Sequence, residues 1–135
     1  MPLTHEEAQT VIAGAHEHAN QQGLRVTVAV VDEGGHLVAL GRMDGAPPLS
    51  SQIAEAKAVG AAVWHREGES LRELNEGRPA FFDQVDRMVR LPMIPGAGSV
   101  LIRRGGAILG AVGVSGALPE QDRECADAGL RSLGG

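Results

Sequence analysis

Two pairs of adjacent glycines, Gly34-Gly35 and Gly105-Gly106, most constrain what this chain can fold into. Each pair lies between two runs of strand-forming residues, which are residues 25–32 and 36–43 around the first pair and residues 100–104 and 107–114 around the second. Strands joined by so few residues pair as antiparallel hairpins, because a parallel connection needs about a dozen residues or more. The sequence therefore predicts an antiparallel sheet built from two hairpins.

Helix-forming segments surround these hairpins. Thr4 and Glu7 form a capping box at the start of the first helix, and Pro119 suits the first turn of the last helix. Between the hairpins a helical pattern begins near Ser50 and continues as shorter pieces through residues 67–90. The order helix, hairpin, helices, hairpin, helix predicts a single α+β domain that spans residues 1–135.

Composition and charge exclude several classes of function. The chain carries 12 Lys and Arg against 17 Asp and Glu, and no basic block provides a surface for nucleic acid. No apolar run reaches the roughly 20 residues that cross a bilayer. The polar, acidic N-terminal residues do not resemble a signal peptide, so a cytoplasmic protein is expected. The single cysteine, Cys125, excludes an internal disulfide and a multi-cysteine zinc site.

The strand around residues 110–116 has almost no side-chain bulk, because it reads GAVGVSG. Glycines in such a strand allow another backbone, or a flat ligand, to approach closely. A chain of this size with so bare a strand is poorly able to bury all of its apolar surface alone. We therefore expect a homo-oligomer, at least a dimer.

Two histidines of the first helix, His16 and His18, are candidate metal ligands. Residues two apart on a helix point in different directions, so the two imidazoles cannot easily share one ion. They lie on opposite flanks of the apolar stripe, where each is also compatible with a solvated surface. A single imidazole is nevertheless sufficient as an axial ligand of heme iron. Of the two, we expect His16 ahead of His18, because His5 shares its flank of the helix and offers a second donor there.

Five short motifs occur in succession along the chain: VVDEGGHLVA from Val30, RMDGA from Arg42, IAEAKA from Ile53, GAVGVSG from Gly110 and EQD from Glu120. Each motif is weak alone, but together they cover nearly the whole chain in a fixed order. In this combination the chain resembles the GlcG/HbpS-like heme-binding family, which includes the C-terminal domain of PduO.

The resemblance implies a profilin-like α+β fold with a five-stranded antiparallel sheet, assembled into dimers or octamers. The fifth strand would have to come from residues 91–99. The resemblance also implies heme as cofactor, held at a subunit interface and used in heme or iron handling. His16 or His18 would then ligate the iron, and an Arg or Lys would face the propionates.

Two other hypotheses belong to different classes of function. The first is a cofactor-free enzyme, for example a cyclase, in which an apolar cleft folds a small hydrophobic molecule and so removes part of the entropy barrier. Its pocket would be lined by Trp64, Phe81, Met88 and Met93. The second is a binding or assembly module without chemistry of its own.

Overall fold

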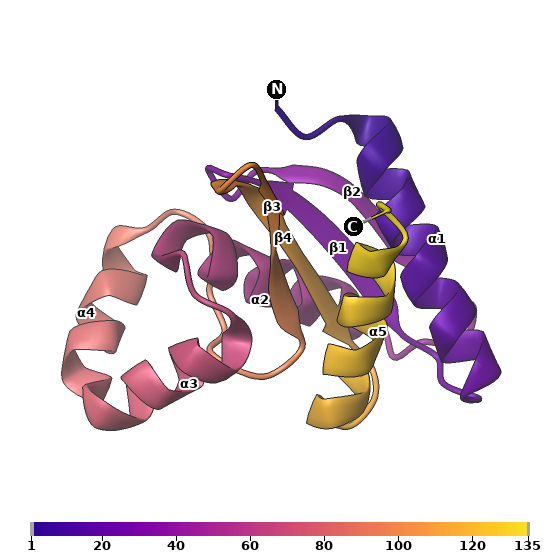
Figure 1. The fold of residues 1–135 in the computed structure, drawn as a ribbon. Coiled ribbons are helices and arrows are strands. Elements are labelled where there is room, and N and C mark those ends of the chain that lie inside the picture. The colour runs from indigo at the N-terminus through magenta and orange to yellow at the C-terminus, as the bar shows by residue number, and fades with distance from the viewer. Residues whose placement is uncertain (1, 135) are drawn as a thin grey trace.

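The computed structural model describes residues 2–134 and contains a sheet of four strands in the order β2-β1-β4-β3. The strands are β1 (Thr27–Asp32), β2 (Leu37–Arg42), β3 (Ser99–Arg104) and β4 (Ala107–Ser115). β1 pairs with β2 and β3 pairs with β4, both antiparallel, so the two predicted hairpins are confirmed. An antiparallel pair of β1 and β4 joins the hairpins into one sheet (Figure 1).

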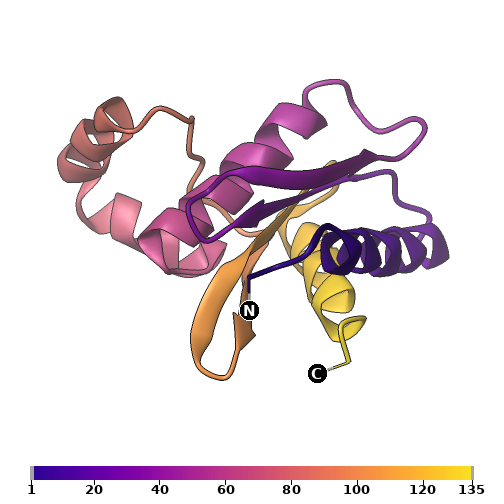
Figure 2. The same ribbon diagram turned by 90° about the horizontal axis from the view of Figure 1, so that it is seen from above.

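Within residues 2–134, five helices accompany the sheet: α1 (His5–Gln21), α2 (Ser50–Trp64), α3 (Gly68–Gly77), α4 (Pro79–Met88) and α5 (Pro119–Arg131). α1 and α5 cover one face and α2 covers the other (Figure 2), which confirms the α+β class. α3 and α4 continue from the end of α2 and extend beyond the sheet (Figure 1). Within the described residues, no helix combines the length and the apolar character that a membrane span requires.

The expectation of a fifth strand from residues 91–99 is wrong, because the described part of the chain forms a four-stranded sheet. Pro92 and Pro95 have no N–H with which to join a ladder. The segment is held by α2 instead, since the N–H of Ile94 donates to the carbonyl of Ala56 at 3.2 Å. A proline-bearing loop therefore crosses α2 where the resemblance implied a strand.

β1 is an inner strand of the sheet, as its run of apolar residues predicts. Its two faces contribute to different core clusters. Val28 and Val30 pack with α1 and α5, whereas Val31 packs with α2, and all three side chains are fully buried. A strand buried on both faces needs apolar residues at consecutive positions, which explains why this one lacks the alternation of a half-exposed strand.

The glycine-rich strand β4 lets a helix backbone approach the sheet directly. A Cβ placed on Gly113 would lie 2.1 Å from the carbonyl oxygen of Ala54 and 2.7 Å from the amide nitrogen of Ala58. Both are backbone atoms of α2, so they cannot yield by a change of rotamer. The sequence predicted that either another backbone or a flat ligand approaches this strand. At Gly113 it is the backbone of α2 that does so.

We predict that Gly113→Ala lowers the free energy of unfolding by at least about 2 kcal/mol, because the added methyl group must push α2 off the sheet. Gly96→Ala is the matched control, since a Cβ there meets nothing within 4 Å and should change stability by less than about 0.5 kcal/mol. Urea unfolding followed by circular dichroism measures both. Equal stability of the two variants would contradict the proposed contact.

Candidate functional site

α1 is anchored at its N-terminus beside the sheet. The Thr4 hydroxyl accepts a hydrogen bond from the Glu7 N–H at 3.0 Å, and a Glu7 carboxylate oxygen accepts one from the Thr4 N–H at 3.0 Å. This backbone hydrogen bond is the main reason why the pKa of Glu7 is lowered, and the charge of Arg104 adds to the effect. The predicted capping box is thus confirmed, and an ion pair of Glu7 with Arg104 fixes the helix start to β3.

The imidazole of His16 lies against the edge strand β2. Its Nε2 atom is 3.0 Å from the carbonyl oxygen of Gly41. The side chain of Ile12, one turn earlier on α1, packs over the same glycine. His16 is therefore a half-buried residue held by the backbone of β2, and not a freely solvated one.

His16 stands between two hollows of an open groove that runs along α1 and β2. The first hollow has a volume of about 400 Å³ and is also lined by His5, Gln9, Ile12, Ala13, Ala39 and Leu40. The second has a volume of about 300 Å³ and is also lined by Asn20, Arg25, Met43 and Asp44. One imidazole thus lies between a hollow of mixed apolar and polar lining and a polar corner that contains a guanidinium group.

Asn20 and Arg25 are two polar residues of this groove that the sequence analysis did not name. Asn20 lies four residues after His16, so helical spacing places it on the same flank of α1. That spacing was the signal from which Asn20 could have been predicted as a neighbour of His16. Arg25 lies beyond the helix end, and its approach to His16 depends on how the chain turns at Gly23 into the sheet.

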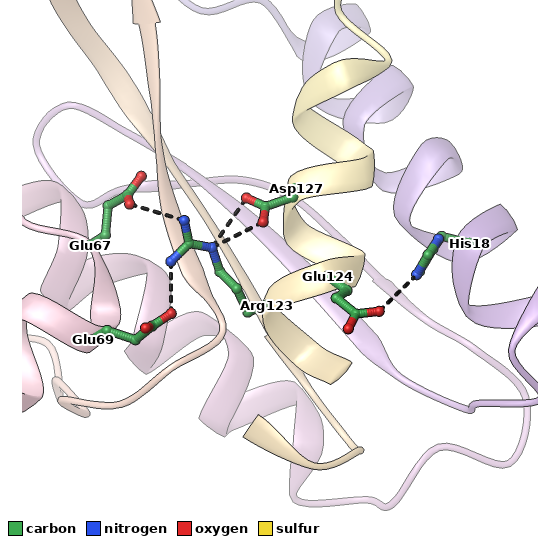
Figure 3. Close-up of polar contacts among 6 residues, drawn as sticks. All are labelled: His18, Glu67, Glu69, Arg123, Glu124 and Asp127. Carbon is green, nitrogen blue, oxygen red and sulfur yellow. Dashed lines mark hydrogen bonds and ion pairs between the residues drawn. The ribbon is translucent and has the colours of Figure 1, made fainter. Parts of the chain in front are cut away.

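His18 faces α5 rather than β2. Its Nε2 atom is 3.7 Å from a carboxylate oxygen of Glu124, and 22% of its side chain is exposed (Figure 3). The two candidate histidines therefore lie on opposite flanks of α1, as the helical pattern predicts, and do not form one site. Which of them binds iron stays a prediction, but His16 is the one that lines the groove.

Near His18, one guanidinium group ties α5 to the start of α3. Arg123 contacts the carboxylates of Glu67, Glu69 and Asp127 at 2.8 to 3.2 Å (Figure 3). Partial desolvation works to lower the pKa of Arg123, but the hydrogen bond and charge of Asp127 and the two glutamates outweigh it and raise that pKa. In the described range 2–134, no group of three or more His, Cys, Asp or Glu side chains could hold a metal ion.

The four residues of the predicted apolar pocket lie in different surroundings. The Trp64 ring stacks on Phe82 with centroids 5.5 Å apart, and Phe81 meets it edge-on at 6.2 Å. Met93 is buried in the core on the α2 side, whereas Met88 is 80% exposed. Much of the aromatic surface is therefore used to pack α4 against the end of α2, so a role as the wall of a substrate pocket stays an untested prediction.

An apolar groove lies instead on the outer surface of α2. It has a volume of about 500 Å³, and its apolar lining includes Leu49, Ile53, Ala56, Val59, Leu91 and Ile94. An adjoining hollow shares Val59 and Leu91 and extends to Met88. The outer face of α2 thus presents a connected apolar surface.

A buried ion pair joins two of the sequence motifs that lie far apart in the chain. The Lys57 ammonium group donates to Asp122 at 3.2 Å and to the carbonyl of Val114 at 3.0 Å, and Asp122 accepts the N–H of Ala117 at 3.0 Å. Burial raises the pKa of Asp122, although Lys57 opposes this. Because the folded pKa is raised, ionising Asp122 opposes folding, and that cost appears as the pH rises above the ordinary carboxyl range.

Cys125 lies one turn of α5 beyond Asp122 and is fully buried. Burial, and secondarily the charge of Asp122, raise the pKa of its thiol to about 11. A thiol with this pKa is almost entirely protonated near neutral pH, and the thiolate is the reactive form. Its environment is that of an inert core residue.

The described part of the chain has the architecture of a small α+β protein, with a four-stranded antiparallel sheet and a histidine-bearing groove beside its edge strand. Residues 3–131 match the family described as haem-degrading protein HbpS-like, so the chain belongs to the HbpS-like family. The protein GlcG of Escherichia coli K12 is 39% identical over 115 residues, which cover 84% of this chain and 81% of GlcG.

Solved structures agree with this assignment. A double mutant of HbpS from Streptomyces reticuli is 32% identical with a TM-score of 0.89, and the match covers 100% of this chain and 89% of that one. A PduOC:heme complex is 24% identical with a TM-score of 0.87, over 98% of this chain and 95% of that one, and this likeness shows the fold alone. The cyclase hypothesis gains no support from these relatives.

We predict that Lys57→Met destabilises the protein by about 3–5 kcal/mol, because it leaves the Asp122 carboxylate buried without its counter-charge. The double variant Lys57→Met/Asp122→Asn should recover part of this loss, since no buried charge remains. Arg87→Met is the control, because Arg87 pairs with Asp83 on the surface, where such pairs contribute up to about 1 kcal/mol. Equal losses for the Lys57 and Arg87 variants in urea unfolding would refute the role of the buried pair.

Proposed function

We propose that this protein binds heme in the groove between α1 and β2, with His16 as the iron ligand. The observation that carries the proposal is the place of the His16 imidazole, between a hollow of mixed lining whose apolar part includes Ile12 and Leu40 and a polar hollow that contains Arg25. Heme has the matching pattern, because a central iron lies in an apolar macrocycle that bears carboxylates at one edge. A binding site usually combines an apolar surface with a few polar groups that fix orientation.

The residues of the groove can be assigned to the parts of the ligand. His16 would supply the nitrogen ligand of the iron, a common mode of holding heme. Ile12 and Leu40 would contact the macrocycle, and Arg25 with Asn20 would face the propionates. Heme, when bound, supplies a redox-active iron. Both hollows are open and lie at the low end of the usual range of roughly 300–1,000 Å³, so the groove covers one side of the ligand.

Membership of the HbpS-like family supports heme as the ligand, because haem degradation is the activity in that family's description. The PduOC:heme complex adds that a protein of this fold has been solved with heme. Transport, sensing or degradation of the bound heme would each be a further step beyond binding.

The test is a titration of the purified protein with hemin, monitored by its Soret band. We expect a saturable band in the wild type. His16→Ala should shift the band and weaken binding by roughly tenfold or more, because the iron loses its protein ligand. Arg25→Ala should weaken binding less and leave the position of the band unchanged, because it removes only a charge partner of the propionates.

His18→Ala is the matched control, because it removes an imidazole from the same helix on the flank that faces α5. It should bind hemin as the wild type does. The loss of the band in His18→Ala but not in His16→Ala would transfer the ligand role to His18 and overturn the placement in the groove. The absence of a saturable band in the wild type would overturn the function itself.

We also propose that the protein is a homo-oligomer, a dimer or an octamer, that uses the apolar outer face of α2. Leu49 is 58% exposed and Met88 is 80% exposed, and both border the connected apolar surface around Val59 and Leu91. Contiguous exposed apolar surface of this kind is typical of contact sites between proteins. A second copy of the chain is the partner that family membership favours.

Light scattering should give a mass above that of one 14.0 kDa chain. Met88→Glu should shift the mass towards the monomer, because it places a charge in the contact. Gln84→Glu is the control, since it adds the same charge at an exposed polar position of α4. A single 14.0 kDa particle at all concentrations would contradict the proposed oligomer. Equal masses for Met88→Glu and Gln84→Glu would show that the apolar face of α2 is not the contact surface.

A further inference from the structure

Gly41 of β2 lies directly beneath the His16 ring. A Cβ placed on Gly41 would be 2.8 Å from Cε1 of His16, 3.3 Å from its Nε2 and 2.7 Å from Cγ2 of Ile12. Distances below 3.0 Å essentially never occur for real Cβ contacts, so any side chain at this position would displace the ring or the helix that carries it. The imidazole therefore reaches the strand because Gly41 has no side chain.

The carbonyl of Gly41 also acts on the protonation of that imidazole. A carbonyl oxygen only accepts hydrogen bonds, so the Nε2 atom that lies 3.0 Å from it carries the proton. In the neutral ring the proton on Nε2 leaves Nδ1 as the nitrogen with a free lone pair. Histidines that bind metals commonly donate their second N–H to a carbonyl in this way, which fixes the ring and makes the other nitrogen a better ligand.

We infer that Gly41 is the positioning residue of the candidate site: its bare Cα admits the His16 ring, and its carbonyl selects the tautomer in which Nδ1 is the ligand atom. The part of this inference that concerns iron rests on the proposed heme function. The part that concerns the ring of His16 does not, because it depends on the contacts of the protein alone.

The decisive measurement uses the protein without heme. Long-range ¹H–¹⁵N correlation spectra distinguish the two neutral tautomers of a histidine ring. We expect the neutral His16 ring of the wild type to be protonated at Nε2, whereas Gly41→Ala should show a mixture of tautomers. Gly77→Ala and Gly96→Ala are controls, because a Cβ at either position meets nothing within 4 Å. Protonation of His16 at Nδ1 in the wild type would overturn the inference without recourse to any variant.

A second arm uses hemin. Gly41→Ala should shift the Soret band and weaken hemin binding by about 10–100-fold, the usual effect of losing a partner that orients a metal ligand. The same substitution made in His16→Ala should cause no further shift, because the ring on which Gly41 acts is gone. An additional shift in that background, or an unchanged band in Gly41→Ala, would refute the positioning role.

The two arms separate failure of the inference from failure of the proposed function. If the wild type binds no hemin but His16 is the Nε2–H tautomer and loses it in Gly41→Ala, the function fails and the positioning holds. If the wild type binds hemin while Gly41→Ala leaves tautomer and band unchanged, the positioning fails and the function holds. Unfolding curves of Gly41→Ala show whether the variant has lost its structure in general. If it has, the tautomer of His16 in the wild type decides whether the inference holds.

Discussion

The rest of the structure depends on the direct contact between the backbones of α2 and β4 at Gly113. With no side chain between them, the helix lies close enough for Lys57 to reach across the sheet to the carbonyl of Val114 and the carboxylate of Asp122. One amine thus connects α2, the end of β4 and the start of α5. A larger residue at Gly113 would separate the layers and leave both charges of the pair poorly satisfied.

This arrangement leaves the opposite layer free to build the groove. α1 packs with α5 and with the sheet, and its outer flank meets the edge strand β2. Beyond Gly41, the Arg42 guanidinium donates to the carbonyl of Ala46 at 2.8 Å and shapes the loop after β2. An edge strand has a neighbour on one side only. That open side is where a helix, a ligand or a second copy of the chain can approach the strand.

Much of the local structure could be predicted from the sequence because it is decided by near neighbours. The glycine turns, the capping box of Thr4 and the close approach at β4 all appear in the structure. In the first of these turns, the Asp32 carboxylate accepts the N–H groups of Gly34 and His36 at 2.9 and 3.0 Å. The fifth strand fails for a reason that is also present in the chain, because the prolines of residues 91–99 cannot donate to a ladder.

The sequence by itself determined the two hairpins, the helices and the presence of His16 and His18 on opposite flanks of α1, because periodicity and turn chemistry act over a few residues. It also determined the motifs that mark the HbpS-like family. Only the tertiary structure decided that His16 meets Gly41, that Arg25 joins the same groove, and that Trp64 is packed against Phe82. These neighbours are brought together by the packing of layers, and no local pattern records that packing.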